Sequence, residues 1–170
     1  MKIIDKTILD KPQSFWLNDA KNLVTSLSKF YGTITLNKIS QKFDDLTSFE
    51  TGLLSVTNAL VRQISLSNDK AMYVYARTVV PENTYKYFTQ ELESLGTKPI
   101  GDNLLFDKSK FDRDEFIIRK LSTLEFQRET NQVAKSDIFS RSSIFKYREN
   151  ADLKLLITEY FLTLPEQYDN

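Results

Sequence analysis

Two residue types that carry much of enzyme chemistry are missing from this 170-residue sequence, which contains no cysteine and no histidine. The lack of cysteine excludes disulfides, thiolate zinc sites and cysteine nucleophiles. The lack of histidine excludes Ser-His triads and removes the commonest metal ligand and general base. Any catalysis must therefore rely on Arg, Lys, Asp, Glu, Tyr, hydroxyl groups and backbone amides, a set suited to binding anions and stabilising charge.

Net charge and long apolar runs are lacking as well. Lys plus Arg and Asp plus Glu number 23 each, so no overall field draws the chain to nucleic acid or to an anionic membrane. The apolar runs fall far short of the roughly 20 residues that a membrane helix needs, and residues 1–13 lack the apolar stretch of a signal peptide. We therefore expect a cytoplasmic protein that binds neither nucleic acid nor membrane.

The residues that are present predict a single α+β domain over residues 1–170. Hydrophobic residues make up 41% of the chain, and no linker or repeat divides it. Apolar spacing predicts helices over 14–30 and 83–95, the second ending at Gly96 as a left-handed cap. Strands joined by tight turns predict a mostly antiparallel sheet. The expected strands are 33–39, 61–66, 71–80, 111–121, 139–147 and 153–164.

The hairpin of 61–66 and 71–80 places two arginines together in its predicted register. With residues 67–70 as the loop, Arg62 lies opposite Tyr75 and shares a face with Arg77. Two buried guanidiniums are costly unless anions pair with them, and a dicarboxylate ligand would satisfy both. Spacing alone favours the alternative that each arginine reaches the surface or pairs with an acidic side chain on a neighbouring strand. A one-residue error in the turn would separate the two arginines onto opposite faces.

Two further features are candidates for the same site. In the predicted strand Glu159 points to the same face as apolar neighbours, so its carboxyl group needs a raised pKa or a bound partner. The opposite face of that strand is equally apolar, so the sequence leaves open which face points inward. The glycines of Leu95–Gly101 allow backbone amides to hold a carboxylate, but a helix cap and a tight turn explain them without a ligand. Arg141 and the serines beside it could line a polar pocket. A strand edge that carries hydroxyl side chains is the simpler interpretation.

Several motifs, in their order and spacing, resemble the chorismate lyase family, whose members split chorismate into 4-hydroxybenzoate and pyruvate. The resemblance covers residues 26–162. The stretch around Arg141 has one arginine fewer than the family pattern, and residues 121–138 form a longer segment than is usual there. The matching motifs are Ser26-Leu27-Ser28, Val61-Arg62-Gln63-Ile64, Ala76-Arg77-Thr78-Val79-Val80-Pro81, Leu95-Gly96 with Pro99-Ile100-Gly101, Leu104-Leu105-Phe106, Arg113-Asp114 and Leu155 to Leu162.

The resemblance implies a six-stranded antiparallel sheet with helices packed over it, and a monomeric lyase that uses no metal and no cofactor. Its partners would be the substrate chorismate and the product 4-hydroxybenzoate, a ubiquinone precursor. Arg62 and Glu159 would be the catalytic residues: Arg62 binds the ring carboxylate, helped by backbone groups near Leu27 and Ile100, and Glu159 bonds the 4-hydroxyl side. Arg77 would serve the enolpyruvyl carboxylate or the access route.

Two other functions compete with this one. The effector-binding domain of one class of bacterial transcription regulators shares this fold, so a non-catalytic domain that binds an aromatic acid is the main alternative. That domain normally follows a winged-helix DNA reader, for which we expect no room ahead of the sheet. The second alternative is a related lyase that acts on a modified chorismate or releases another hydroxybenzoate. Fold analogy alone cannot decide between them.

Overall fold

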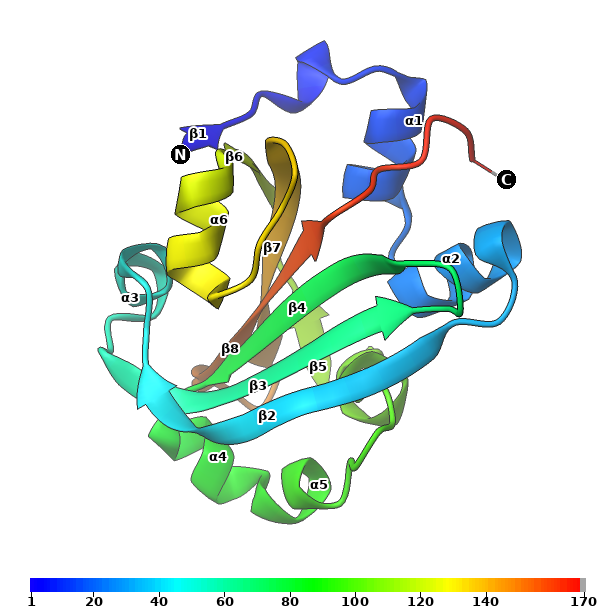
Figure 1. Cartoon of the computed structure of the whole chain (residues 1–170). Helices are drawn as coiled ribbons and strands as arrows, with labels where there is room; N and C mark the ends of the chain where they lie inside the picture. The colour runs from blue at the N-terminus through cyan, green and yellow to red at the C-terminus, as the bar shows by residue number, and fades with distance from the viewer. Residues whose placement is uncertain (169–170) are drawn as a thin grey trace.

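The computed structural model describes residues 1–168, in which the strands build one eight-stranded antiparallel sheet. Its strand order is β1-β6-β7-β8-β4-β3-β2, and β5 pairs with β7 (Figure 1). The α+β class is confirmed, but the strand count of six was wrong, because a short N-terminal strand joins the sheet and residues 111–121 divide into two strands. The strands are β1 (Lys2–Ile3), β2 (Thr35–Asp45), β3 (Asn58–Ser67), β4 (Met72–Val80), β5 (Phe111–Arg113), β6 (Ile117–Leu121), β7 (Ile138–Tyr147) and β8 (Asn150–Phe161).

The helices are short, and both predicted long helices are interrupted. Residues 14–30 divide because Ala20 leaves the helical conformation and the Asn22 side chain caps a new helix. Residues 83–95 form two helices, followed by Gly96 at the expected positive φ of 57°. No helix within residues 1–168 is long and apolar enough to cross a membrane. The helices are η1 (Lys6–Ile8), α1 (Lys11–Ser14), the π-helical η2 (Phe15–Asp19), α2 (Leu23–Tyr31), α3 (Ser48–Leu54), α4 (Glu82–Tyr87), α5 (Thr89–Glu93), the π-helical η3 (Gly101–Leu105) and α6 (Thr123–Thr130).

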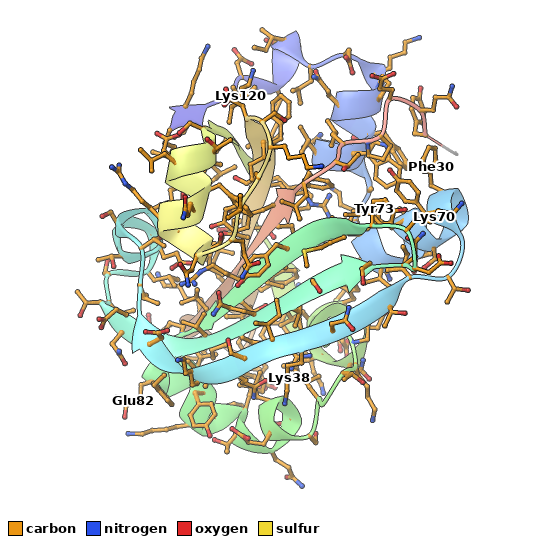
Figure 2. The ribbon with its side chains drawn as sticks, viewed as in Figure 1. Phe30, Lys38, Lys70, Tyr73, Glu82 and Lys120 are labelled. Carbon is orange, nitrogen blue, oxygen red and sulfur yellow. The ribbon has the colours of Figure 1, made fainter. Side chains whose placement is uncertain are left out.

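The helices divide between the two faces of the sheet (Figure 1). We call the face covered by α2, α4, α5 and η3 the α2 face, and the face covered by α3 and α6 the α6 face. Along β3 the residues alternate, so Ile64 packs in the core of the α2 face while Ala59 packs in that of the α6 face. At one end of the sheet Tyr73 stacks on Tyr31 at 3.9 Å between ring centroids, beside Phe30 (Figure 2). This contact fixes the end of α2 against β4.

The register of the β3–β4 hairpin differs from the predicted one. Arg62 pairs with Thr78, and Gln63 pairs with Arg77. The predicted pairing of Arg62 with Tyr75 was therefore wrong. The turn is organised by Asn68, whose backbone N–H donates to the Ala71 carbonyl at 3.0 Å, and a bulge follows Leu66. The resulting shift is odd in number, which puts Arg62 on the α2 face and Arg77 on the α6 face.

The C-terminal hairpin has the predicted strands but a different place in the sheet. Strand β7 pairs with β8 on one side and with β5 and β6 on the other. The strand edge expected around Arg141 was therefore wrong, because β7 is an interior strand. Arg141 pairs directly across from Glu159. Cross-strand partners share a face, so the two charged side chains lie together on the α2 face.

Candidate active site

A pocket opens on the α2 face, between the strands, the first turn of α2 and the η3 segment. It contains about 610 Å³ of empty space, including space open to solvent at its mouth. Its mostly apolar lining suits a small aromatic ligand. Three charged side chains interrupt the apolar surface. The lining consists of Asn22, Leu23 and Val24, of Leu36, Arg62, Ile64, Leu66, Ala76, Thr78, Ile157 and Glu159 from the strands, and of Pro99, Ile100, Gly101, Phe106 and Arg113.

Arg62 is buried in the pocket wall and bonds only to neutral groups. Its Nη1 donates to Gln41 Oε1 at 2.9 Å, and its Nη2 donates to the carbonyls of Gly96 and Lys98, each at 3.1 Å. Burial lowers the pKa of the guanidinium below its usual value. Within residues 1–168 no carboxylate lies at ion-pair distance from Arg62. The side chain is thus rigidly held, while its charge is not compensated by a neighbour.

Glu159 faces the pocket with a fixed cationic partner behind it. Its Oε1 accepts from Arg141 Nε at 2.7 Å. Arg141 is fully buried, and its Nη1 donates to the carbonyl of Trp16 within η2 at 3.0 Å and to that of Ala20, directly after η2, at 2.7 Å. The requirement that Glu159 have a bound partner or a raised pKa is met by this ion pair. The pair keeps the carboxylate in one orientation at the pocket surface.

Arg113 is a second arginine of the pocket that lacks an acidic partner. Its Nε donates to Ser143 Oγ at 3.1 Å and its Nη1 donates to the Lys21 carbonyl at 2.8 Å. The guanidinium also stacks over the Phe116 ring at 4.4 Å. Burial, opposed by Glu159 and assisted by the charge of Arg141, lowers the pKa of Arg113 to about 10. No carboxylate of residues 1–168 lies within ion-pair distance of it.

The structure brings together three of the residues singled out from the sequence and leaves two outside. Arg62, Ile100 and Glu159 line the same pocket. Leu27 does not line it, because its side chain is buried in the core beneath α2. Arg77 lies on the other face of the sheet, where its Nε and Nη2 donate to Glu50 at 2.9 Å each. The alternative interpretation, in which an arginine pairs with an acidic side chain, is confirmed for Arg77, but its partner Glu50 lies in helix α3 and not on a neighbouring strand.

Arg113 and Arg141 were not selected as site residues from the sequence. Arg113 was noted only as part of a motif, and Arg141 only as one of two interpretations of a serine-rich strand. Their contacts come from residues distant in sequence, such as Lys21 and Trp16. One signal for Arg141 was present in the predicted hairpin of β7 and β8. Arg141 pairs directly across from the candidate carboxylate of Glu159, and cross-strand partners share a face.

The glycines between α5 and η3 shape the pocket wall. Gly96 has a positive φ of 57°, and its carbonyl accepts from Arg62. A Cβ on Gly101 would lie 2.4 Å from the ring of Phe106. The glycine therefore lets the Phe106 ring pack against the backbone at the pocket. This is a role in packing, and it differs from the carboxylate-holding loop considered from the sequence.

Comparisons with known proteins give relatives in sequence and in fold. In curated relatives, a probable chorismate pyruvate-lyase of Coxiella burnetii is 27% identical over 164 residues, covering 93% of this chain and 86% of that protein. A probable chorismate pyruvate-lyase 2 of Pseudomonas entomophila is 29% identical over 162 residues, which cover 92% of this chain and 83% of that protein.

Two solved structures with a similar fold are domains of transcription regulators. The effector-binding domain of the Bacillus subtilis trehalose repressor gives a TM-score of 0.58 at 6% identity, covering 80% of this chain and 95% of that one. The ligand-binding domain of a putative GntR-family regulator from Bordetella bronchiseptica gives a TM-score of 0.55 at 14% identity, and the match covers 82% of this chain and 90% of that one. At such identities the likeness concerns the fold alone. The sequence model of the chorismate lyase family, by contrast, matches residues 6–170, and the chain belongs to that family.

Proposed function

We propose that this protein is a chorismate pyruvate-lyase that converts chorismate into 4-hydroxybenzoate and pyruvate in the pocket of the α2 face. The observation that carries the proposal is the pocket itself, which joins the uncompensated cation of Arg62 to the oriented carboxylate of Glu159 in an apolar cavity. Membership of the family supports it. The proposal includes a monomer that acts in the cytoplasm without metal or cofactor.

In the proposed binding mode, Arg62 and Glu159 hold opposite sides of the substrate ring. Arg62 binds the ring carboxylate through charge-assisted hydrogen bonds. Ile100 and the first turn of α2, at Leu23 and Val24, flank that end, and this turn takes the place that the sequence suggested for Leu27. Glu159 accepts a hydrogen bond from the ring hydroxyl, which lies across the ring from the carboxylate.

The reaction requires little covalent help from the protein. The bond between the ring carbon and the ether oxygen breaks, and its electron pair leaves with the enolpyruvyl oxygen. The hydrogen on the hydroxyl-bearing ring carbon is lost as a proton, and the enolpyruvate gains a proton to become pyruvate. Aromatisation of the ring drives the step, so the protein needs to orient the ether and stabilise the moving charge. Glu159 orients the hydroxyl or takes the ring proton, whereas direct transfer to the leaving group needs no base.

The proposal is tested by incubating the purified protein with chorismate and EDTA and measuring both products by chromatography. We expect equal amounts of 4-hydroxybenzoate and pyruvate, and a much lower rate for Glu159→Gln. Absence of product together with tight 4-hydroxybenzoate binding would identify an aromatic-acid binding domain instead. A different hydroxybenzoate isomer would indicate a related lyase. An unchanged rate in Glu159→Gln would remove that residue from the mechanism.

A further inference from the structure

The five arginines that lie within strands divide into two groups by their ion pairs. Three of them bond a carboxylate at short distance: Arg77 with Glu50 at 2.9 Å, Arg119 with Glu129 at 3.0 Å and Arg141 with Glu159 at 2.7 Å. The other two, Arg62 and Arg113, bond only neutral oxygens of residues 1–168. Both of these line the same pocket. A shielded guanidinium without a counter-charge is unfavourable unless a ligand supplies one.

The charges of the pocket therefore match a dianion. Glu159 and Arg141 cancel each other, which leaves the positive charges of Arg62 and Arg113. Lys21 lies near Arg113 as well, but its ammonium group donates to the Asn18 carbonyl at 2.8 Å and the residue does not line the pocket. A ligand with two carboxylates would satisfy both arginines, and a ligand with one carboxylate would leave one charge unmatched.

The position of Arg113 selects which carboxylate it meets. Strand β3, which carries Arg62, is separated from β7 by β4 and β8, a distance of roughly 14 Å between backbones. Arg113 is anchored to Ser143 on β7, the strand that also carries Arg141 behind Glu159. Arg113 thus lies toward the Glu159 end of the pocket. On the chorismate ring the enolpyruvyl ether is attached next to the hydroxyl and away from the ring carboxylate.

We infer that Arg113 binds the carboxylate of the enolpyruvyl group and so determines the preference of the site for a dicarboxylate over a simple hydroxybenzoate. This inference rests on the proposed function, in which chorismate is the substrate. The Nε and Nη1 groups of Arg113 are held by Ser143 and Lys21, and its Nη2 is the donor left for the ligand. Arg77, paired with Glu50 on the opposite face, takes no part.

The test compares two ligands that are already aromatic and cannot react: 3-hydroxybenzoate and 3-(1-carboxyvinyloxy)benzoate, which differ only by the enolpyruvyl group. Dissociation constants are measured by calorimetry for the wild type and for Arg113→Gln, Arg113→Lys and Arg62→Gln. The matched control is Arg148→Gln, since Arg148 lies outside the pocket and pairs with Asp112 at 3.5 Å.

We expect Arg113→Gln to weaken binding of the ether on the order of tenfold to a hundredfold, the range for one hydrogen bond between charged groups, while 3-hydroxybenzoate changes less than about threefold. Arg113→Lys should lose less, Arg62→Gln should weaken both ligands, and Arg148→Gln should weaken neither. Unchanged 3-hydroxybenzoate binding also shows that a variant is folded.

Equal weakening of both ligands by Arg113→Gln, or of neither, would overturn the assignment, as would an ether that the wild type does not bind. Because the ether needs no turnover, these results are separate from the product assay. Product formation by the wild type together with an unchanged ether affinity in Arg113→Gln would overturn the role of Arg113 alone. Absence of product with the expected loss of ether affinity would overturn the lyase activity alone.

Discussion

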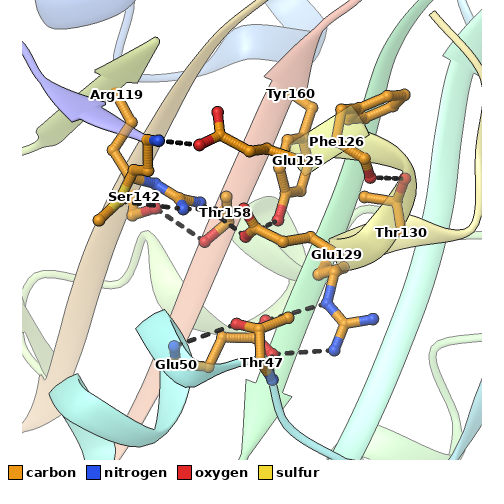
Figure 3. Close-up of polar contacts among 12 residues, drawn as sticks. Thr47, Glu50, Arg119, Glu125, Phe126, Glu129, Thr130, Ser142, Thr158 and Tyr160 are labelled. Carbon is orange, nitrogen blue, oxygen red and sulfur yellow. Dashed lines mark hydrogen bonds and ion pairs between the residues drawn. The ribbon is translucent and has the colours of Figure 1, made fainter. Parts of the chain in front are cut away.

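The two faces of the central strands differ in how far the charges of their arginines are compensated, because the α2 face holds the Arg141–Glu159 pair and also two arginines without an acidic partner. On the α6 face, Glu50 pairs with Arg77. Glu129 pairs with Arg119 and also accepts a hydrogen bond from the Tyr160 hydroxyl at 3.0 Å (Figure 3). These charges compensate one another within the protein. On the α2 face, Arg62 and Arg113 meet only neutral oxygens. The first arrangement needs no charge from outside the protein, whereas under the proposed function a bound anion completes the second.

The pKa values of the arginines follow this division. Burial lowers the pKa of Arg62, and it lowers that of Arg113 to about 10. Burial also disfavours the charge of Arg77, but its hydrogen bonds to Glu50 outweigh this and raise the pKa. Glu50 therefore stabilises the cationic form of Arg77, whereas burial disfavours that of Arg62 and Arg113, which agrees with the ligand-binding role proposed for these two.

The largest expected effect is on activity, in Arg62→Gln. We expect kcat/KM for chorismate to fall by about 10²- to 10⁴-fold, because two hydrogen bonds to a charged group are worth about 1.5–3 kcal/mol each. The free energy of unfolding should fall by no more than about 1–2 kcal/mol, since no carboxylate loses its partner. Initial rates and urea unfolding measure the two quantities. A large loss of stability with normal turnover would reverse the assignment of this face.

Glu50→Gln should have the opposite pattern. It leaves Arg77 buried without a counter-charge, which lowers the free energy of unfolding by about 3–5 kcal/mol, while kcat/KM of the folded protein stays unchanged. Glutamine preserves the capping box that Glu50 forms with Thr47 at the start of α3, so the lost charge is isolated from the lost cap. Adding Arg77→Met should restore stability in the double variant. Lost turnover in a folded Glu50→Gln protein would contradict the comparison.

Arg141 is expected to act on catalysis through Glu159. In Arg141→Lys a single ammonium cannot bond Glu159 and the carbonyls of Trp16 and Ala20 together in the geometry of the guanidinium. We expect kcat to fall by roughly tenfold to a hundredfold with little change in KM, because misplacing a reacting group slows the chemical step. A raised KM with normal kcat would mean that Arg141 contributes to substrate binding instead.

The smallest expected effect is that of Gly101→Ala. The added Cβ would displace the Phe106 ring from the pocket wall, at a cost of about 1–3 kcal/mol in stability, and it should raise the KM for chorismate. Gly52→Ala is the matched control, because a Cβ there meets nothing within 4 Å and alanine favours the helix. Thermal unfolding and initial rates measure both variants. A normal KM in Gly101→Ala would show that the Phe106 wall does not shape binding.

The sequence predicted the fold class and both hairpins, since those depend on alternation and turn residues close together in the chain. It misplaced Arg77 because the face of every residue in β3 and β4 depends on one bulge and on the turn at Asn68. It also could not show that Asn22 restarts a helix after η2. Local patterns predict the strands well, but a single residue in a turn or bulge decides to which face of the sheet the side chains point.

The candidate site was predictable only in part, for a similar reason. Arg62, Ile100 and Glu159 belong to motifs that resemble the family, and all three line the pocket. The positions of Arg113 and Arg141 depend on hydrogen bonds to groups far away in sequence, at Lys21, Ser143 and Trp16. Such contacts leave no spacing signal in a single sequence, and only the pairing of Arg141 with Glu159 across the β7–β8 hairpin offered a local one.

The most direct test of the account is a crystal structure of the protein with 3-(1-carboxyvinyloxy)benzoate bound. We predict the ring carboxylate at Arg62, the ether carboxylate at Arg113, and the Arg77–Glu50 pair unchanged on the other face. A ligand bound against Arg77, or one with both carboxylates away from Arg62 and Arg113, would contradict the division of the sheet into a structural face and a binding face.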